Sequence, residues 1–294
     1  MFIDIHTHAT LYKVIPLRDG RYFITPDELV ATMDQAGIDM AVVLPLVSPS
    51  QRAFLLPTEE VLEVCARYPE RLIPFCCLDP RQDLYTIKSD FTRILDIYKA
   101  HGCKGVGEVT VNLPFDDPLV WNLFQHVEAS GLPLIFHIAP QVGGYYGMVD
   151  ELHLPRLEKT LQRFPGLPFL GHSQPFWAEI SADVTDANRN GYPPGPVVPG
   201  GRVPELMRTY PNLHGDLSAG SGFNAISRDP AFGYRFLEEF QDRLFFGTDL
   251  LSPGQNLPQV EYLNSAVQQT KITREAFEKI TWKNADRLLG LGIG

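Results

Sequence analysis

The chain opens with MFIDIHTHAT (residues 1–10), in which a short apolar run leads into two histidines, His6 and His8. Side chains alternate along a strand, so both imidazoles are expected on one face, with Thr7 on the other. With eight histidines in 294 residues, roughly one such sequence in five would hold an H-x-H pair by chance. The rest of the chain therefore decides what this pair means.

The run before His6 is the first of eight short apolar runs that alternate with helix-like segments. Thr25, Pro26 and Gly37 give the segment 25–37 the cap, first turn and end that a helix needs. Similar segments occupy 57–71, 117–131 and 273–292. The eight runs are 2–5, 40–46, 72–79, 105–109, 133–138, 168–173, 213–218 and 243–249. This alternation predicts parallel strands covered by helices, and most simply one α/β domain over residues 1–294, a (β/α)8 TIM barrel. An open doubly wound sheet is the alternative, although no Gly-rich phosphate loop follows the first run.

A segment rich in Pro and Gly, residues 174–203, interrupts the alternation between the sixth and seventh runs. In a barrel it is a βα loop on the catalytic face, and it is long enough to form a lid or a pocket wall. A disordered insertion is the alternative. It is disfavoured because Phe176 and Trp177 would then be left in water.

Composition excludes several classes of partner. The net charge is −10 and no cluster of Lys and Arg occurs, which argues against nucleic acid and anionic membrane surfaces. No apolar stretch is long enough for a membrane span, and no basic segment with an apolar h-region begins the chain. We therefore expect a cytoplasmic protein. The four cysteines lack zinc-ribbon or disulfide spacing and are expected to be reduced thiols of the core: Cys65, Cys76, Cys77 and Cys103.

Ionisable residues stand at the ends of several runs, where packing alone would favour Val, Ile or Leu. Besides the opening pair they are Glu108, His137, His172 and Asp249. Taken singly, each has an ordinary explanation as a cap, a hydrogen-bonded core residue or a solvated group. Together, four imidazoles and two carboxylates at one barrel mouth form a ligand set for a borderline divalent metal. The other four histidines fit this pattern less well: His101, His126, His153 and His214.

In this arrangement the sequence resembles the amidohydrolase superfamily of metal-dependent barrel enzymes. The family signature is H-x-H after the first strand, His after the fifth and sixth, and Asp after the eighth. The stretches CCLDPR, GTDLLSP and KNADRLLGL look like the amidohydrolase-2 branch, which includes aminocarboxymuconate semialdehyde decarboxylase. Decarboxylases of that branch are similar in using a single metal and typically carry no metal-bridging acid on the fourth strand. Glu108 instead looks like the bridging acid of TatD-type metallohydrolases. The resemblance thus implies that it can join one cation on His6, His8 and Asp249 to another on His137 and His172.

We expect a hydrolase of a small ester, lactone or amide, with one or two divalent ions, zinc before Mn, Fe or Mg. Asp249 would hold the attacking water and move its proton, and His172 would assist if it binds no metal. Candidate substrate contacts are Arg52, Tyr145, Tyr146, Trp177 and Arg228. The alternative is a nonoxidative decarboxylase in which Arg52 binds the carboxylate of the substrate. A binding or scaffolding protein without catalysis is a third reading. The partner is expected to be a small molecule, and a homodimer is expected from base rates alone.

Overall fold

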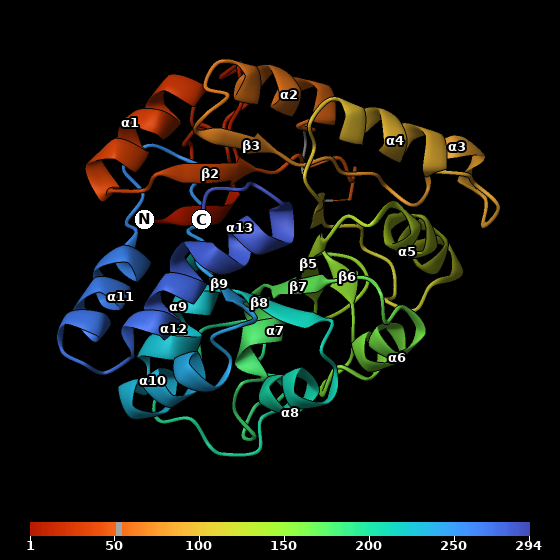
Figure 1. The fold of residues 1–294 in the computed structure, drawn as a ribbon. Helices are drawn as coiled ribbons and strands as arrows, with labels where there is room; N and C mark the ends of the chain where they lie inside the picture. The colour runs from red at the N-terminus through yellow and green to blue at the C-terminus, as the bar shows by residue number, and fades with distance from the viewer. Residues whose placement is uncertain (51–54) are drawn as a thin grey trace.

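The computed structural model describes residues 1–50 and 55–294, in which parallel strands alternate with helices (Figure 1). The eight predicted strands are all present: β1 Ile3–Thr7, β2 Met40–Val43, β3 Leu72–Pro74, β4 Val106–Val109, β5 Leu134–Ala139, β7 Phe169–His172, β8 Leu213–Asp216 and β9 Leu244–Phe245. A short strand that the sequence did not predict, β6 Met148–Val149, pairs with β5.

The strands form two sheets, in the orders β1-β2-β3 and β4-β5-β7-β8-β9. Isolated parallel bridges connect the sheets at both seams, Cys76 with Val106 and Thr7 with Leu250. Strands that are adjacent in the ring are thus consecutive in the order in which the eight predicted strands follow along the chain. This is the predicted (β/α)8 fold, with a hydrogen-bond ladder that is interrupted at the two seams.

The helices surround the strands and follow the predicted segments. In α1, Thr25 and Glu28 form a reciprocal capping box, and Gly37 ends the helix at a φ of 72°. The predicted closing helix, 273–292, is helical from Arg274 to Leu289 and contains a π turn, Lys279–Lys283, between α12 and α13. The helices are α1 Pro26–Ala36, α2 Thr58–Ala66, α3 Gln82–Tyr85, α4 Thr92–Ala100, α5 Pro118–Ser130, α6 Pro155–Arg163, α7 Gln174–Ala178, α8 Arg202–Thr209, α9 Ala219–Ser227, α10 Pro230–Glu239, α11 Pro258–Gln268, α12 Arg274–Glu278 and α13 Asn284–Leu289.

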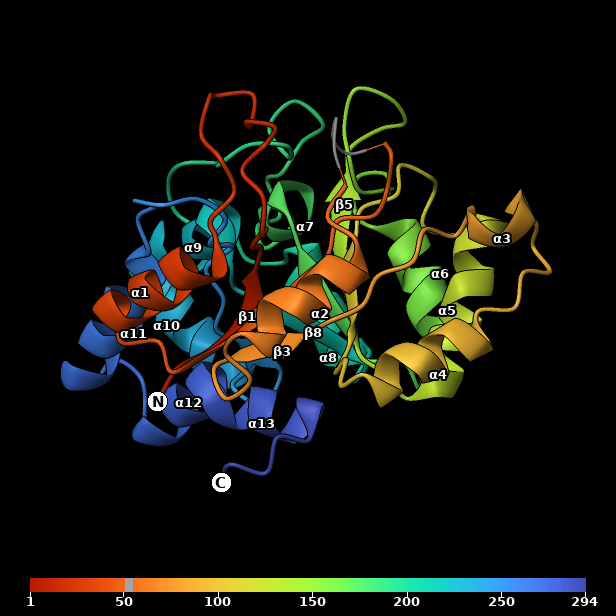
Figure 2. The ribbon, with the colours of Figure 1, turned by 90° about the horizontal axis from the view of Figure 1, so that it is seen from above.

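The core has two layers. One lies between helices and strands, and the other fills the inside of the strand ring, where apolar residues of six strands meet Ala285 and Leu289 of α13. Figure 2 shows that α13 and both termini lie at one end, while the loops after the strands rise together at the other. The apolar inner layer therefore supports whatever side chains occupy the loop end.

Two strands depart from regular pairing, and both carry predicted ligands. The register between β1 and β2 shifts between Asp4 and Thr7, and that between β4 and β5 shifts between Val106 and Val109. Such bulges insert an extra residue and re-aim side chains. In β1 the shift allows Ile5 to join the inner apolar layer while the adjacent His6 also contacts the groups at the loop end.

The long segment 174–203 begins differently from the prediction. Its first residues form α7, and α8 already starts at Arg202. Phe176 and Trp177 lie in the core, 0% and 2% exposed, so the segment is anchored at its start. The four cysteines are free and buried, as predicted.

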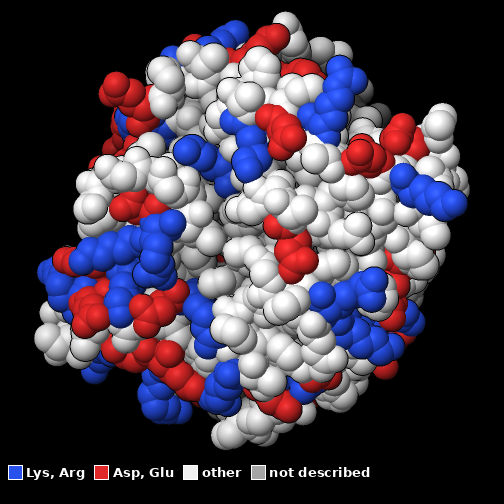
Figure 3. All heavy atoms as spheres, turned by 45° about the vertical axis from the view of Figure 1, so that its right-hand side comes forward, with Lys and Arg blue, Asp and Glu red and all other residues white. Residues whose placement is uncertain are grey.

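Within the described residues, no helix combines the length and the apolar character that crossing a membrane requires. On the face drawn in Figure 3, basic and acidic side chains lie intermingled around a largely uncharged middle. That face therefore carries no patch of a single sign.

Candidate metal centre

His6 and His8 from β1 and its loop form what we call the first half of the centre, together with Asp249 from the loop after β9. The Nε2 atoms of the two imidazoles face each other at 3.2 Å. Their outer nitrogens are held by other groups: Asp216 Oδ2 lies 2.6 Å from His6 Nδ1, and the Leu44 carbonyl oxygen lies 2.9 Å from His8 Nδ1. Both rings thus present the same nitrogen to the inside.

Asp249 is the third member of the first half and contacts both histidines. Its Oδ1 lies 3.7 Å from His6 Nε2 and 3.6 Å from His8 Nε2. Its backbone has a φ of 55°, a conformation that is unusual for a residue other than glycine, and its N–H donates to the His6 carbonyl. The carboxylate is 23% exposed, whereas the His6 side chain is fully buried. The Asp249 carboxylate is therefore more accessible to solvent than the histidine that it contacts.

His137 and His172, at the ends of β5 and β7, form the second half. Their rings are 5.3 Å apart, and the His172 ring lies 4.4 Å from that of His6. His172 Nδ1 is 2.8 Å from Ser218 Oγ, which leaves Nε2 facing inward. His137 has the opposite orientation, with Nδ1 facing the centre, where it lies 2.7 Å from Glu108 Oε1.

Glu108 lies between the two halves, with one carboxylate oxygen toward each. Oε2 is 3.9 Å from His6 Nε2 and 3.7 Å from His8 Nε2. Oε1 is 2.7 Å from His137 Nδ1 and 3.9 Å from His172 Nε2. The side chain is 4% exposed. All six predicted ligand residues are therefore brought together, in overlapping groups whose ligand atoms lie within 4.8 Å of one another.

The electrostatics of the centre differ between His6 and His172. Burial opposes protonation of His6, but Asp216, and then Asp249 and Glu108, raise its pKa to about 10. Burial also opposes charge on Glu108, yet the hydrogen bond and charge of His137 hold the pKa of Glu108 well below its usual range. Burial, and then the charge on His6, lowers the pKa of His172 to about 3. His172 therefore takes up a proton less readily than His6.

A divalent cation fits this donor set. Zinc–nitrogen bonds of about 2.05 Å with tetrahedral angles place two ligand nitrogens about 3.3 Å apart, close to the separation of His6 and His8 Nε2. Within the described residues, the ion pairs of Glu108 and Asp216 are all with histidines and none is with Lys or Arg. A bound cation would replace the proton on His6 and balance the carboxylates.

Among the predicted substrate contacts, Tyr146 lies beside a candidate ligand, whereas Trp177 and Arg228 make structural hydrogen bonds. Tyr146 packs against His137 with ring centroids 4.4 Å apart and the rings tilted by 43°, and its neighbour Tyr145 is 40% exposed on the same loop. Trp177 donates its indole N–H to the Asp216 carbonyl and has almost no exposed surface for a substrate. Arg228 Nη1 donates to the Pro193 carbonyl and so holds the long loop. Arg52 lies outside the described residues.

Asp216 and Ser218 are site residues that the prediction missed. Asp216 lies within the seventh run, 213–218, and ends β8, so the strand-end rule that selected the other candidate ligands applies to it as well. It is fully buried, and burial raises its pKa, but the charge and hydrogen bond of His6 lower it below the usual value. Ser218 has no comparable sequence signal, since a serine after a strand is an ordinary loop residue.

The remaining histidines lie outside the ligand set. His101 ends α4 and His126 lies within α5. His153 is largely exposed, with Nδ1 3.4 Å from Glu179 Oε2. His214 packs beside Phe245 of the inner layer.

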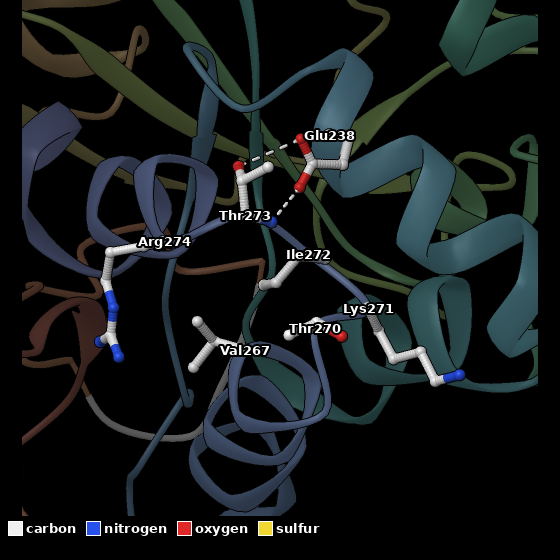
Figure 4. Close-up of a pocket in the computed structure, with 7 residues that line it drawn as sticks. All are labelled: Glu238, Val267, Thr270, Lys271, Ile272, Thr273 and Arg274. Atoms are coloured by element: carbon white, nitrogen blue, oxygen red, sulfur yellow. Dashed lines mark hydrogen bonds between the residues drawn. The ribbon is translucent and has the colours of Figure 1, made fainter.

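A surface groove of about 630 Å³ lies beside α10, α11 and α12, and is separate from the ligands (Figure 4). Glu238 accepts hydrogen bonds from the backbone and hydroxyl of Thr273 in it. None of its seven lining residues is a candidate ligand.

Comparison with known proteins identifies the family of the chain. The amidohydrolase-2 family model matches residues 3–291. The chain belongs to the amidohydrolase-2 family. This is a family of metal-dependent enzymes, and the described residues offer candidate metal-binding His and Glu groups. No curated protein sequence matches the chain significantly.

Solved structures show the same fold at low identity. An uncharacterized TIM-barrel protein from Bordetella bronchiseptica has a TM-score of 0.69 and 18% identity, with 98% of each chain covered. The 5-carboxyvanillate decarboxylase from Sphingomonas paucimobilis has a TM-score of 0.61 and 18% identity, with 98% of each chain covered. A protein from Pseudomonas putida classed as a 2-pyrone-4,6-dicarboxylic acid hydrolase has a TM-score of 0.62 and 15% identity, with 100% of this chain and 98% of that chain covered. At these identities the likeness shows the fold alone.

Proposed function

We propose that the protein is a metal-dependent hydrolase of a small ester, lactone or amide, and that Glu108 bridges two divalent cations, most simply zinc. The observation that carries the proposal is the orientation of Glu108. One of its oxygens faces the His6 and His8 nitrogens at 3.7–3.9 Å, and the other faces His137 and His172 at 2.7 and 3.9 Å. A carboxylate with histidine pairs on both sides is the donor arrangement of a two-cation site.

When bound, the cations would lower the pKa of water and polarise the carbonyl under attack. Asp249 has the position of the general base, because it is the one ligand with appreciable exposure and lies against both first-half nitrogens. Its carboxylate would accept a proton from the attacking water and return it to the leaving group. Tyr146, which packs against the His137 ring, would form a wall of the mouth beside the reacting carbonyl.

The proposal is tested by loading the protein with zinc and assaying a panel of lactones, esters and amides. Hydrolysis of at least one class that is lost on chelation and restored by zinc supports it. Release of carbon dioxide from carboxylic acids without any hydrolysis contradicts it.

A nonoxidative decarboxylase is the second candidate, and one observation favours it. His6, His172 and Asp249 form a ligand group of their own, while Glu108 and His137 are already joined at 2.7 Å. In that arrangement one cation would bind and Glu108 would serve only as a partner of His137. Among proteins with this fold, the 5-carboxyvanillate decarboxylase is named for such a reaction. The cation count per chain separates the two candidates.

A further inference from the structure

Asp216 touches a histidine from each half of the centre. Its Oδ2 is 2.6 Å from His6 Nδ1 and 3.5 Å from His172 Nδ1. Ser218 extends this contact, because its Oγ is 2.8 Å from His172 Nδ1 while its N–H donates to Asp216 Oδ1 at 3.0 Å. One carboxylate and its bonded neighbour therefore reach the outer nitrogens of both rings.

The surrounding backbone holds Asp216 in place. The Trp177 indole donates to the Asp216 carbonyl at 2.8 Å. On the other side, a Cβ atom at Gly247 would lie 2.7 Å from Asp216 Oδ1 and 2.8 Å from Ser218 Cβ. Only a glycine allows the loop after β9 to pass this close, so the carboxylate has little freedom to move.

We propose that Asp216 is a positioning residue that controls cation binding in both halves at once. Its carboxylate keeps the proton of His6 on Nδ1, and the Ser218 hydroxyl does the same for His172. Both Nε2 atoms then face inward without a proton, and each can ligate a cation through its lone pair. Outer partners of this kind fix the tautomer and orientation of a ligating imidazole and raise its basicity. Glu108 links the halves from the inside, and Asp216 links them from the outside.

This inference rests on the proposed function, since it needs cations in both halves. It also predicts an asymmetry between two neighbouring residues. Asp216 contacts both rings, whereas Ser218 contacts the ring of His172. Loss of the carboxylate should therefore weaken both cation sites, and loss of the hydroxyl should weaken only the second half.

The experiment compares zinc titrations of the wild type, Asp216→Asn, Ser218→Ala and the control Asp150→Asn. Asp150 is a buried acid that caps the start of α6 through Arg156 and Leu157. It matches Asp216 in burial without being a partner of the ligands. Competition with a chromophoric chelator gives both zinc affinities, elemental mass spectrometry gives the zinc content, and ring ¹⁵N shifts report the histidine tautomers.

We expect Asp216→Asn to weaken both zinc affinities by about 10- to 100-fold. Ser218→Ala should weaken only one affinity, and Asp150→Asn should change neither by more than about twofold. The ¹⁵N shifts of His6 should move away from the Nδ1–H tautomer in Asp216→Asn. Unchanged zinc affinities, or loss confined to one half, in a folded Asp216→Asn protein overturn the inference.

Two further outcomes keep the inference distinct from the proposed function. If wild-type protein binds about two zinc ions and Asp216→Asn binds both normally, the positioning role fails while the two-cation site stands. If the wild type binds one or none, both fail together. Should Asp216→Asn not fold, Ser218→Ala decides, because equal weakening of both sites or of neither contradicts the selective contact with His172.

Discussion

In the first half of the centre, His6 and His8 are oriented by groups outside it, Asp216 at 2.6 Å and the Leu44 carbonyl at 2.9 Å. In the second half, His172 is the only histidine with such an outer partner among the described residues, and His137 instead turns Nδ1 to Glu108. The first half is therefore arranged in advance of any cation, whereas the second depends on Glu108. This difference predicts that the first half fills with higher affinity, because less reorganisation accompanies binding.

The largest expected effect comes from Asp249→Asn, which removes the exposed acid of the first half. If this carboxylate moves the proton, turnover should fall by about 10²- to 10⁴-fold. Rates are measured on whichever panel substrate the zinc-loaded enzyme hydrolyses, with circular dichroism as the control for folding. Activity within a few-fold of wild type would assign the proton transfer to another group.

Glu108→Gln tests the dependence of the second half directly. The amide keeps the shape but loses the charge that would bridge the cations, so zinc content should fall from about two equivalents to about one. The affinity of the first half should change by less than about tenfold, since its rings keep their outer partners. If Glu108→Gln instead removed the more tightly bound zinc, zinc binding in the first half would also depend on Glu108, contrary to this account.

The halves should also respond oppositely to pH in chelated protein. The folded-state pKa of His6, about 10, lies above its unfolded value, so His6 stabilises the fold below about pH 6.5 and this stability is lost as pH rises toward 10. The pKa of His172, about 3, lies below the unfolded value, so its contribution is present above about pH 6.5 and is lost as pH falls toward 3. Melting temperatures across pH should show His6→Asn flattening the alkaline limb and His172→Asn the acid limb. The same change in both variants would contradict the separate environments.

The smallest effect is expected from Tyr146→Leu, which removes the aromatic ring that packs against His137. Aromatic pairs contribute about 0.5–1.5 kcal/mol, so the second zinc affinity should weaken by about two- to tenfold while the first is unchanged. Asn112→Ala should act in the same direction, because Asn112 bonds to Gln141, Gly143 and Gly147 of the loop that carries Tyr146. A chelator competition titration measures both, and a change in the tighter affinity would contradict the comparison.

Much of this arrangement follows from local rules. Capping at Thr25 and Gly37 and apolar runs of strand length predict the elements. Ionisable residues at strand ends select the six candidate ligands that the structure brings together. The bulges in β1 and β4 could not be predicted, because they arise from pairing with strands remote in sequence. The helical turn that carries Trp177 could not be predicted for a related reason: a Pro- and Gly-rich segment predicts a loop, whereas tertiary packing draws its first turn into the core.

Asp216 shows where strand-end reasoning was available but incompletely applied. It ends β8 as Glu108, His137 and His172 end or nearly end theirs. Its side chain, however, faces the back of the ligands instead of the mouth, and no periodicity in one strand reveals which neighbour it meets. Outer partners of ligands thus become identifiable only when the ring of strands is assembled.

The central claim is that Glu108 divides the centre into a prearranged half and a dependent half, and a zinc titration monitored with elemental mass spectrometry tests it most directly. We predict about two equivalents per chain, bound with distinct affinities, of which Glu108→Gln loses the weaker. A single equivalent in the wild type, unaffected by Glu108→Gln, would contradict the claim and favour the one-cation decarboxylase arrangement.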